Sequence, residues 1–252
     1  YRQLVGELFV SPEATEKAEG LLQHHFEYLD SFNRDLFTLF EEKAVLAQGE
    51  MISTALMHYY LEEIGQESVL LPALAFMRID KDLEPDNFYI RENLNRELSQ
   101  HTGIKLFITQ GFICRDVFGE IDNLKRGGSD YTASIIGAAI DAEEIQIWTD
   151  IDGFHNNDPR IVEGTKRIDE LSFDEVAELA YFGAKILHPT SVKPAQLKNI
   201  PVRLKNTLQP ESPGTLITEK VTGKGKIKAV AAKDGITSIR IRSGRMLLAY
   251  GF

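Results

Sequence analysis

The chain has 252 residues, of which 43% are hydrophobic, so it can bury a large core and lacks the composition of a disordered protein. Its formal net charge of -10 argues against a nucleic-acid partner, because such binding depends on clustered Lys and Arg. A single cysteine, Cys114, excludes an internal disulfide, and without a signal peptide or an apolar run of roughly 18 residues we expect a cytoplasmic protein with no membrane partner.

The first part of the chain is predicted to be helical. Ser11 can accept hydrogen bonds from the first free amides of a helix, and Pro12 then stands at the first helical position, where its missing donor costs nothing. A second helix is predicted from near Glu50 through MISTALMHYYLEEIG, and Gly65 should stop it. Apolar residues recur at helical spacing in the first of these segments: Leu21, Leu22, Phe26 and Leu29.

Four strand-like runs follow, and their continuous apolar character predicts strands that are buried on both faces. They are SVLLPALAFMRI from Ser68, IKLFITQGFI from Ile104, IQIWTDID from Ile145 and IPVRLKNT from Ile200. The helix-forming segment SDYTASIIGAAIDA lies between the second and third runs. Alternating strands and helices predict an α/β fold, a three-layer αβα sandwich with a mainly parallel central sheet. In such sheets, ligands bind at the carboxyl ends of the strands.

The stretch LKRGGSDYTA is the first candidate site. Gly127 and Gly128 permit close approach of a ligand, and Ser129 is expected to cap a helix whose free amides attract phosphate or carboxylate. Lys125 and Arg126 add positive charge, and an arginine can grip a carboxylate through two hydrogen bonds. Asp130 suits a ligand that also carries an ammonium group or Mg²⁺. An ordinary exposed turn explains the same residues about as well.

The second candidate is IWTDIDGFHNNDPRIV, where a predicted strand ends in Thr149, Asp150 and Asp152. These polar groups would stand at the edge of the sheet where a nucleotide could bind. Taken alone, the stretch is better explained as a turn with solvated acids. Its spacing of aspartates also resembles a calcium loop, but the bidentate glutamate that ends such a loop is missing.

The third candidate is AKILHPTSVKPA, which follows a capping signal from Ser172 to Glu175. Lys185 could reach a phosphate from a helix end, or could simply be solvated. His188, before a proline, is more typical of a turn than of a catalytic base. The six histidines have no metal-binding spacing, so we expect no protein metal centre.

The amino-acid composition of the chain changes near Thr218. EKVTGKGKIK is rich in Gly and Lys, and three short β-like patterns follow it. We therefore expect a first domain over residues 1–218 and, over residues 219–252, a linker and the beginning of a second domain. The chain starts at Tyr1 rather than at Met and ends in the apolar MLLAYGF, so we expect it to be a fragment of a longer protein.

Together, these stretches resemble one family. ITQGFI, RGGSDYTA, WTDIDG, DPRIV, AKILHP and IPVRLKNTLQPESPGTLI stand in the order found in aspartate kinases of the amino acid kinase superfamily. The segment QGEMIST, which contains Glu50, is similar to the family's Gly-Glu segment. The tail from Ile227 resembles the start of an ACT regulatory domain.

The resemblance implies a reaction and a set of partners. Aspartate kinases transfer the terminal phosphoryl group of ATP, with Mg²⁺, to the side-chain carboxylate of L-aspartate, in the first step toward lysine, threonine and methionine. That carboxylate is already ionised at neutral pH, so the enzyme needs no general base and works by alignment and charge neutralisation. The family implies a homodimer or higher homo-oligomer, and inhibition by lysine or threonine.

The resemblance also implies roles for particular residues. Arg126 would bind the α-carboxylate of aspartate, and Glu50 would bind its ammonium group. Lys125, Ser129 and Asp130 would complete the acceptor end, where phosphoryl transfer takes place. The residues that would line the nucleotide are Thr149, Asp150, His155, Arg160 and Lys185.

Two departures from the family pattern qualify this assignment. The family usually has Tyr where this chain has His155, and the family's Lys, Phe, Gly, Gly motif is not present, so we expect residues 1–252 alone to be inactive. Two alternatives remain open. One is another amino acid kinase, such as a glutamate kinase; the other is a catalytically silent amino acid sensor.

Overall fold

The computed structural model describes residues 1–32, 37–124, 127–182, 186–221, 227–232, 235 and 237. Helices and strands alternate along most of this length, and the predicted α/β class is correct. Among the described strands, three pairs are parallel and two are antiparallel. No described helix is both long and apolar enough to cross a membrane.

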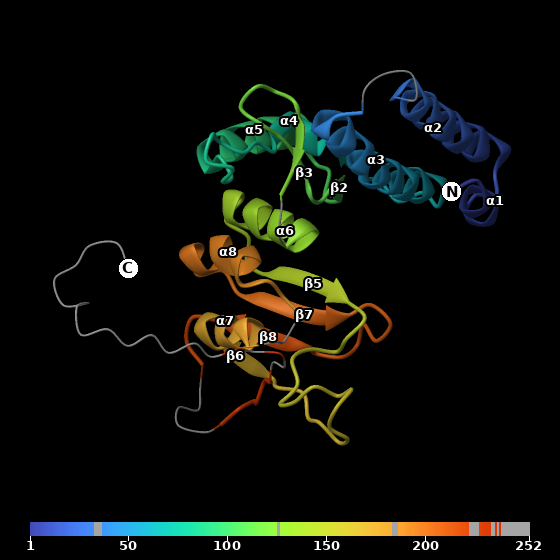
Figure 1. Cartoon of the computed structure of the whole chain (residues 1–252). Helices are drawn as coiled ribbons and strands as arrows, with labels where there is room; N and C mark the ends of the chain where they lie inside the picture. Colours follow the sequence, from blue (N-terminus) through green and yellow to red (C-terminus); the bar gives the residue numbers. More distant parts are fainter. Residues whose placement is uncertain are drawn as a thin grey trace.

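Three helices form the N-terminal part of the molecule: α1 (Arg2–Leu8), α2 (Pro12–Ser31) and α3 (Leu39–Glu63) (Figure 1). The predicted cap of α2 is confirmed, because Ser11 Oγ accepts a hydrogen bond of 3.2 Å from the amide of Ala14. The helices share a small apolar core, made of Val5, Phe9, Ala18, Leu22, Ile52 and Leu56.

The long helix α3 begins earlier than the sequence pattern predicted. It starts at Leu39 rather than near Glu50, because Thr38 and Glu41 form a capping box. The side chain of Thr38 accepts from the backbone of the first turn, and the side chain of Glu41 accepts from the amide of Thr38. It ends at Glu63, and Gly65 follows with a φ of 74°, as expected for a helix stop. Glu50 therefore lies in the middle of a continuous helix rather than at its start.

The middle of the chain builds a second core. The strands β1 (Val69–Leu71) and β2 (Phe107–Thr109) pair in parallel, and β3 (Ile113–Arg115) and β4 (Ile121–Asn123) form a hairpin. The helices α4 (Ala73–Phe76) and α5 (Asn87–Ser99) pack beside them. The largest buried side chains here include Phe76, Met77, Ile79, Ile90, Ile113 and Ile135.

Two predicted strands are shorter than the apolar runs that suggested them. The run from Ser68 forms a strand only as far as Leu71, because Pro72 has no amide to donate to the sheet and the helix α4 starts immediately after it. The run from Ile104 is divided into β2 and β3 by a sharp bend at residues 110–112.

The C-terminal half contains a four-stranded sheet of order β5-β7-β8-β6. Its strands are β5 (Ile145–Thr149), β6 (Glu170–Ser172), β7 (Val202–Asn206) and β8 (Thr215–Thr218). Around it lie the helices α6 (Gly128–Ala139), α7 (Phe173–Tyr181) and α8 (Lys193–Lys198), and the 3-10 turn η2 (Pro189–Val192). The capping box predicted for Ser172 and Glu175 is present at the start of α7.

The helix α6 connects the two cores. It lies between α5 and β3 on one side and β5 on the other (Figure 1). Ile135 and Ala139 belong to the middle core, whereas Ala133 packs against the core of the four-stranded sheet. At Gly137 the helix lies so close to the sheet that a methyl group would be 2.5 Å from side-chain atoms of Ile145. The helix α6 is thereby packed against both halves.

One strand does not have the burial that its apolar run predicted. In β5, Ile145 and Ile147 are buried, but Gln146 and Trp148 face outward, and 44% of Trp148 is exposed. The face of β5 that carries Ile145 and Ile147 packs into the core, whereas the opposite face, with Gln146 and Trp148, is exposed. Trp148 instead contacts the ammonium group of Lys205, which lies 4.8 Å from its ring centroid.

Candidate active site

The candidate site is built around the start of α6. Gly127 and Gly128 have φ values of 81° and 38°, a region that side chains disfavour, and Gly127 is the residue that caps the helix. The prediction that Ser129 caps α6 is wrong, because the helix already begins at Gly128, and within the described residues no side chain accepts a hydrogen bond from its first amides. Those amides therefore stay available to an anion, as expected for this helix start.

Gly111 packs against the first turn of α6 on one side. A methyl group at Gly111 would lie 2.8 Å from Cβ and 3.0 Å from Cα of Ser129, which is closer than real side chains approach. The next residue, Phe112, has a φ of 68°, and its amide donates to Thr132 Oγ1 at 2.9 Å. Strained backbone of this kind persists where its surroundings hold it, often at functional sites. The end of β2 and the start of α6 thus form one fixed unit.

The turn η2 packs against the other side of the glycine pair. A methyl group at Gly127 would lie 2.8 Å from Cβ of Ser191, whose hydroxyl donates to the carbonyl oxygen of His188 at 2.6 Å. The amide of Thr190 donates to Nδ1 of His188 at 3.3 Å, so this histidine is a turn residue, as its place before a proline predicted. The segment that follows Lys185 in sequence is therefore brought to the start of α6.

Ser129 and Asp130 differ in exposure at this helix start. Ser129 is exposed, whereas Asp130 is half-buried in the first turn. Burial raises the pKa of the Asp130 carboxyl above its ordinary value. A carboxylate that is costly to ionise in the free protein gains from a cation or a hydrogen-bond donor brought by a ligand.

Glu50 is linked to the same region through a chain of hydrogen bonds. The carbonyl oxygen of Glu50 accepts from Thr54 Oγ1 at 2.7 Å, and Thr54 Oγ1 accepts from Nε2 of Gln110 at 2.9 Å. Gln110 stands directly before Gly111, the glycine that packs against Ser129. The helix that carries Glu50 is thus tied to the strand end that supports α6.

A second group of polar residues lies at the carboxyl ends of β5 and β7. Thr149 and Asn206 are register partners in these parallel strands, and the amide of Thr207 donates to the carbonyl oxygen of Thr149 at 2.8 Å. Thr149 Oγ1 also donates to Asp150 Oδ1 at 3.0 Å. Because α6 leads into β5 and runs in the opposite direction, the start of α6 stands at the edge of the sheet where β5 ends (Figure 1). The structure therefore brings both predicted groups to one edge.

The loop after β5 holds His155 and Arg160 through its own acidic residues. His155 Nε2 lies 2.7 Å from Asp152 Oδ1, and its Nδ1 lies 2.9 Å from Thr165 Oγ1. Arg160 binds Asp158 through two nitrogens and is largely exposed. The hydrogen bonds from Arg160 lower the pKa of Asp158 to about 2. His155 is thus fixed in the loop, whereas Arg160 stands at its surface.

Three predicted site residues lie outside the described residues: Lys125, Arg126 and Lys185. Their neighbours Gly127 and Ile186 are described, so the structure gives the place of the flanking chain only. Within the described residues, no group of three or more His, Cys, Asp and Glu side chains gathers in a way that could hold a metal ion.

The sequence analysis did not identify the residues whose hydrogen bonds and packing hold the site in place. Gln110, Thr54 and Thr132 make the hydrogen bonds described above, and Ser191 packs on Gly127. Gln110 carried one signal, since a polar residue at the end of an otherwise apolar strand is unusual. Thr54 and Thr132 carried none, because hydroxyl residues within helices are common and their partners are distant in sequence.

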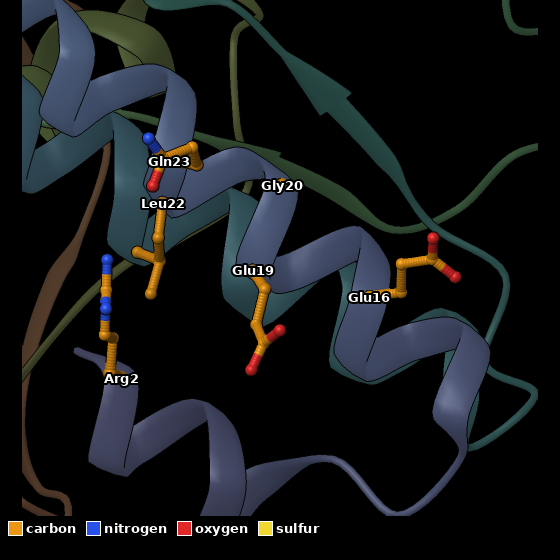
Figure 2. Close-up of a pocket in the computed structure, with 6 residues that line it drawn as sticks. All are labelled: Arg2, Glu16, Glu19, Gly20, Leu22 and Gln23. Carbon is orange, nitrogen blue, oxygen red and sulfur yellow. The ribbon is translucent and has the colours of Figure 1, made fainter.

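A hollow between α1 and α2 lies away from these strand ends. Its volume is about 400 Å³, and it is lined by Arg2, Glu16, Glu19, Gly20, Leu22 and Gln23. Figure 2 shows Glu19 and Leu22 projecting from α2 into the gap toward α1, whereas Glu16 points away from it. No strand end or glycine-lined turn opens into this hollow, so it lacks the features that define the candidate site.

Comparisons with known proteins agree on one family. The model of the amino acid kinase family matches residues 11–206. The chain is 33% identical to lysine-sensitive aspartokinase 3 of Escherichia coli over 98% of its own length and 60% of that protein. It is 35% identical to chloroplastic aspartokinase 3 of Arabidopsis thaliana over 92% of its own length and 44% of that protein. The chain thus spans about half the length of these relatives.

Solved structures give the same result. The structure of Escherichia coli aspartokinase III with aspartate and ADP, in the R-state, matches with a TM-score of 0.76 and 34% identity, over 86% of this chain and 49% of that one. The structure of the same enzyme with lysine and aspartate, in the T-state, matches equally well.

Proposed function

The chain belongs to the amino acid kinase family, and on that basis we propose that the protein containing it is an aspartate kinase. It transfers the terminal phosphoryl group of ATP to the side-chain carboxylate of L-aspartate. The observation that carries the proposal is the start of α6, where free amides and the half-buried Asp130 stand at the carboxyl-end edge of the sheet. Its similarity to an enzyme whose structure contains aspartate and ADP supports the choice of substrates.

The amino acid binds between α3 and the start of α6. Glu50 attracts its ammonium group, and Arg126 binds its α-carboxylate through a charge-assisted pair of hydrogen bonds. Lys125 and Ser129 hold the side-chain carboxylate that is to be phosphorylated, and Asp130 completes this end of the site beside the Mg²⁺ that accompanies the phosphates. Because this carboxylate is ionised at neutral pH, no residue has to remove a proton from it.

ATP binds along the carboxyl ends of β5 and β7. Thr149 and Asp150 line the nucleotide together with His155 and Arg160 from the following loop, and Lys185 reaches the phosphates. The described residues suit such a ligand, since backbone and hydroxyl groups gather at these strand ends and the start of α6 offers free amides. Mg²⁺ would arrive with the phosphates and complete its shell with water and with one of the carboxylates of Asp130 and Asp150. The bound metal neutralises charge that develops during transfer.

We also propose the domain plan that the sequence suggests. Residues 1–218 form the kinase domain, and residues 219–252 are a linker and the beginning of an ACT domain. Pairing of such domains gives a homodimer or higher homo-oligomer, and lysine or threonine binds there as an inhibitor. The relative whose structure contains lysine supports inhibition by an amino acid of this class.

The proposal is tested by measuring ADP release by the full-length protein with MgATP and aspartate, glutamate or no acceptor. An aspartate kinase releases ADP with aspartate and forms an acyl phosphate that hydroxylamine traps. Preference for glutamate would replace the proposal with a glutamate kinase. Aspartate binding without turnover would indicate a silent sensor.

A second measurement separates the two halves of the site. Glu50→Gln should raise the KM for aspartate and leave the KM for ATP unchanged, whereas Asp150→Asn should do the reverse. If both variants change the KM for the same substrate, the assignment of Glu50 to aspartate and of Asp150 to ATP is wrong.

A further inference from the structure

We propose that Gln110 is a positioning residue that fixes Glu50 relative to the start of α6, and that it thereby sets the affinity for the amino acid substrate. This inference rests on the proposed function. Gln110 itself touches no substrate; it acts through Thr54 on one side and through Gly111 on the other.

The oxygen and the nitrogen of the Gln110 side-chain amide both make hydrogen bonds to neighbouring elements. Oε1 accepts a hydrogen bond of 2.7 Å from the amide of Ala73, and Nε2 donates one of 2.9 Å to Thr54 Oγ1. Ala73 follows β1, the strand parallel to β2, so the first bond joins two neighbouring strand ends. The second bond joins these strand ends to α3.

The bond to α3 reaches the helix at the turn that carries Glu50. Thr54 is one turn after Glu50, and its hydroxyl donates back to the Glu50 carbonyl oxygen at 2.7 Å. A hydroxyl that donates to one group and accepts from another fixes the rotation of both. The position of this helical turn therefore depends on the reach of the Gln110 side chain.

The backbone after Gln110 determines the position of α6. Gly111 leaves no room between itself and Ser129, and the amide of Phe112 donates to Thr132 Oγ1 at 2.9 Å. The three consecutive residues 110–112 thus bind α3 and α6 at once. A displacement of either helix changes the distance between Glu50 and the first turn of α6.

Packing alone does not explain a glutamine at this position. Only 5% of Gln110 is exposed, and burying an amide is unfavourable unless its hydrogen bonds are satisfied. A methionine would fill nearly the same volume without that requirement. The amide does what an apolar side chain cannot, since it binds a donor and an acceptor in fixed directions.

This geometry matters because an α-amino acid has a fixed distance between its ammonium group and its carboxylates. Groups that recognise both ends must keep that spacing, and small misplacements are costly in binding and in rate. Loss of the Gln110 amide should therefore weaken aspartate binding about tenfold. ATP, which binds at the ends of β5 and β7, should be unaffected.

The experiment uses the full-length protein and the variants Gln110→Met, Thr54→Val and both together. Each single variant is expected to raise the KM for aspartate about tenfold, with the KM for ATP unchanged. The double variant should be no worse than either single variant, because both changes remove the same connection. Aspartate binding, followed by calorimetry without ATP, should weaken in parallel.

Gln48→Met is the matched control. Gln48 is as buried as Gln110 and lies on α3, the helix that carries Glu50 and Thr54. Its side-chain amide contacts His25 Nδ1 at 2.6 Å and donates to the carbonyl oxygen of Ala44 at 2.8 Å. Its partners belong to the N-terminal helices and not to the site. This variant should lose stability without a selective change in the KM for aspartate.

The outcomes distinguish this inference from the proposed function. If the unmodified protein has no aspartate kinase activity, the proposed function fails. If it is active and Gln110→Met changes both KM values equally, or neither, Gln110 is only a packing residue. Should Gln110→Met fail to fold, Thr54→Val decides alone, and a normal KM for aspartate in that variant overturns the inference.

Discussion

Gly111 and Ser129 are in such close contact that no side chain fits between them, although they lie in different elements and are distant in sequence. The atoms that a methyl group on Gly111 would meet are Cβ and Cα of Ser129, which cannot rotate away. Gly111→Ala is therefore expected to push the first turn of α6 outward. Overpacking of this kind costs about 1–3 kcal/mol of unfolding free energy.

The effect of Gly111→Ala should appear both in thermal unfolding and in a higher KM for aspartate. Gly20→Ala is a suitable control, because Gly20 lies within α2 and a methyl group there would meet nothing within 4 Å. That variant should be stabilised by about 0.5–1 kcal/mol, since alanine is the better helix former. Equal behaviour of the two variants would contradict the close packing of Gly111 on α6.

Asp130 is expected to reduce stability in the free protein. Burial raises its pKa, so the folded state favours the protonated carboxyl. Its favourable contribution is complete below the unfolded pKa of about 3.9 and is lost as the pH rises through the higher folded value. Near neutral pH, Asp130→Asn should therefore raise the melting temperature. The gain in the free energy of unfolding should be less than about 1 kcal/mol, because the group is partly solvated.

The pH dependence of the stability of Asp130→Asn tests this prediction. The stability gain should shrink as the pH falls toward the usual pKa of aspartate, about 3.9, and kinase activity should fall sharply at every pH. Melting curves across this pH range, paired with ADP release, measure both. A variant that is less stable near neutral pH would show that the ionised carboxylate is stabilised in the free protein.

Gly214 supports the loop that is proposed to hold the nucleotide. It has a φ of 71°, and a methyl group there would overlap the carbonyl oxygen of Leu204 in β7. The next residue, Thr215, uses its hydroxyl to accept from the amide of Phe154 at 2.9 Å. Gly214→Ala should therefore disturb the β7–β8 pair and, through Thr215, raise the KM for ATP.

Gly164→Ala is the control that separates the cost of backbone strain from the cost of steric overlap. Gly164 has nearly the same φ, 73°, but a methyl group there would meet nothing within 4 Å. Its replacement should cost about 1–2 kcal/mol from backbone strain alone, and Gly214→Ala should cost clearly more. Chemical denaturation of both variants measures the difference, and similar losses would refute the overlap with Leu204.

Local signals in the sequence were enough to predict several parts of the fold and site. The start of α2 follows from Ser11 and Pro12, and the unusual backbone angles ahead of α6 follow from Gly127 and Gly128, because each feature depends on residues that are adjacent in the chain. The same holds for the capping box at Ser172. Thr38 and Glu41 stand at the spacing of an equally local signal for the start of α3, which the prediction of a helix from near Glu50 did not use.

Other features depend on contacts that no local pattern shows. Gln110 binds Thr54 and Ala73, which come from two other elements, and its role becomes visible only when the parallel pairing of β1 and β2 is known. The length of β2 had the same difficulty, since the apolar run continues through residues 110–112 while the backbone bends there to meet α6. The roles of the proposed site residues in binding remain predictions.

The last prediction concerns the segment 227–232, which lies against the kinase domain. Lys228 Nζ is 2.9 Å from Glu175 Oε2 and 3.5 Å from the carbonyl oxygen of Glu170, and the amide of Val230 donates to the carbonyl oxygen of Asn156 at 2.9 Å. Asn156 lies in the loop between Asp150 and Arg160. The first residues of the proposed regulatory region are thus bonded both to the start of α7 and to the proposed nucleotide loop.

Lys228→Met should release this segment with little loss of global stability, since a partly exposed ion pair contributes roughly 0.2–1 kcal/mol. The amide of Val230 should then exchange with solvent faster, as measured by NMR. Lys220→Met, at an exposed lysine a few residues earlier, should leave that exchange unchanged.

The pH dependence of the same exchange follows from Glu175. Burial alone would raise the pKa of Glu175, but the hydrogen bonds from Lys228 and from the Ser172 amide outweigh it and lower the pKa. The contribution of this pair is therefore present above the unfolded pKa of about 4.3 and is lost as the pH falls through the lower folded value. After correction for the intrinsic pH dependence of exchange, protection of Val230 should decline in that range in the unmodified protein and should be low throughout in Lys228→Met. If protection is the same in both proteins at every pH, Lys228 does not hold the segment, and the proposed connection between the regulatory region and the nucleotide loop must follow another route.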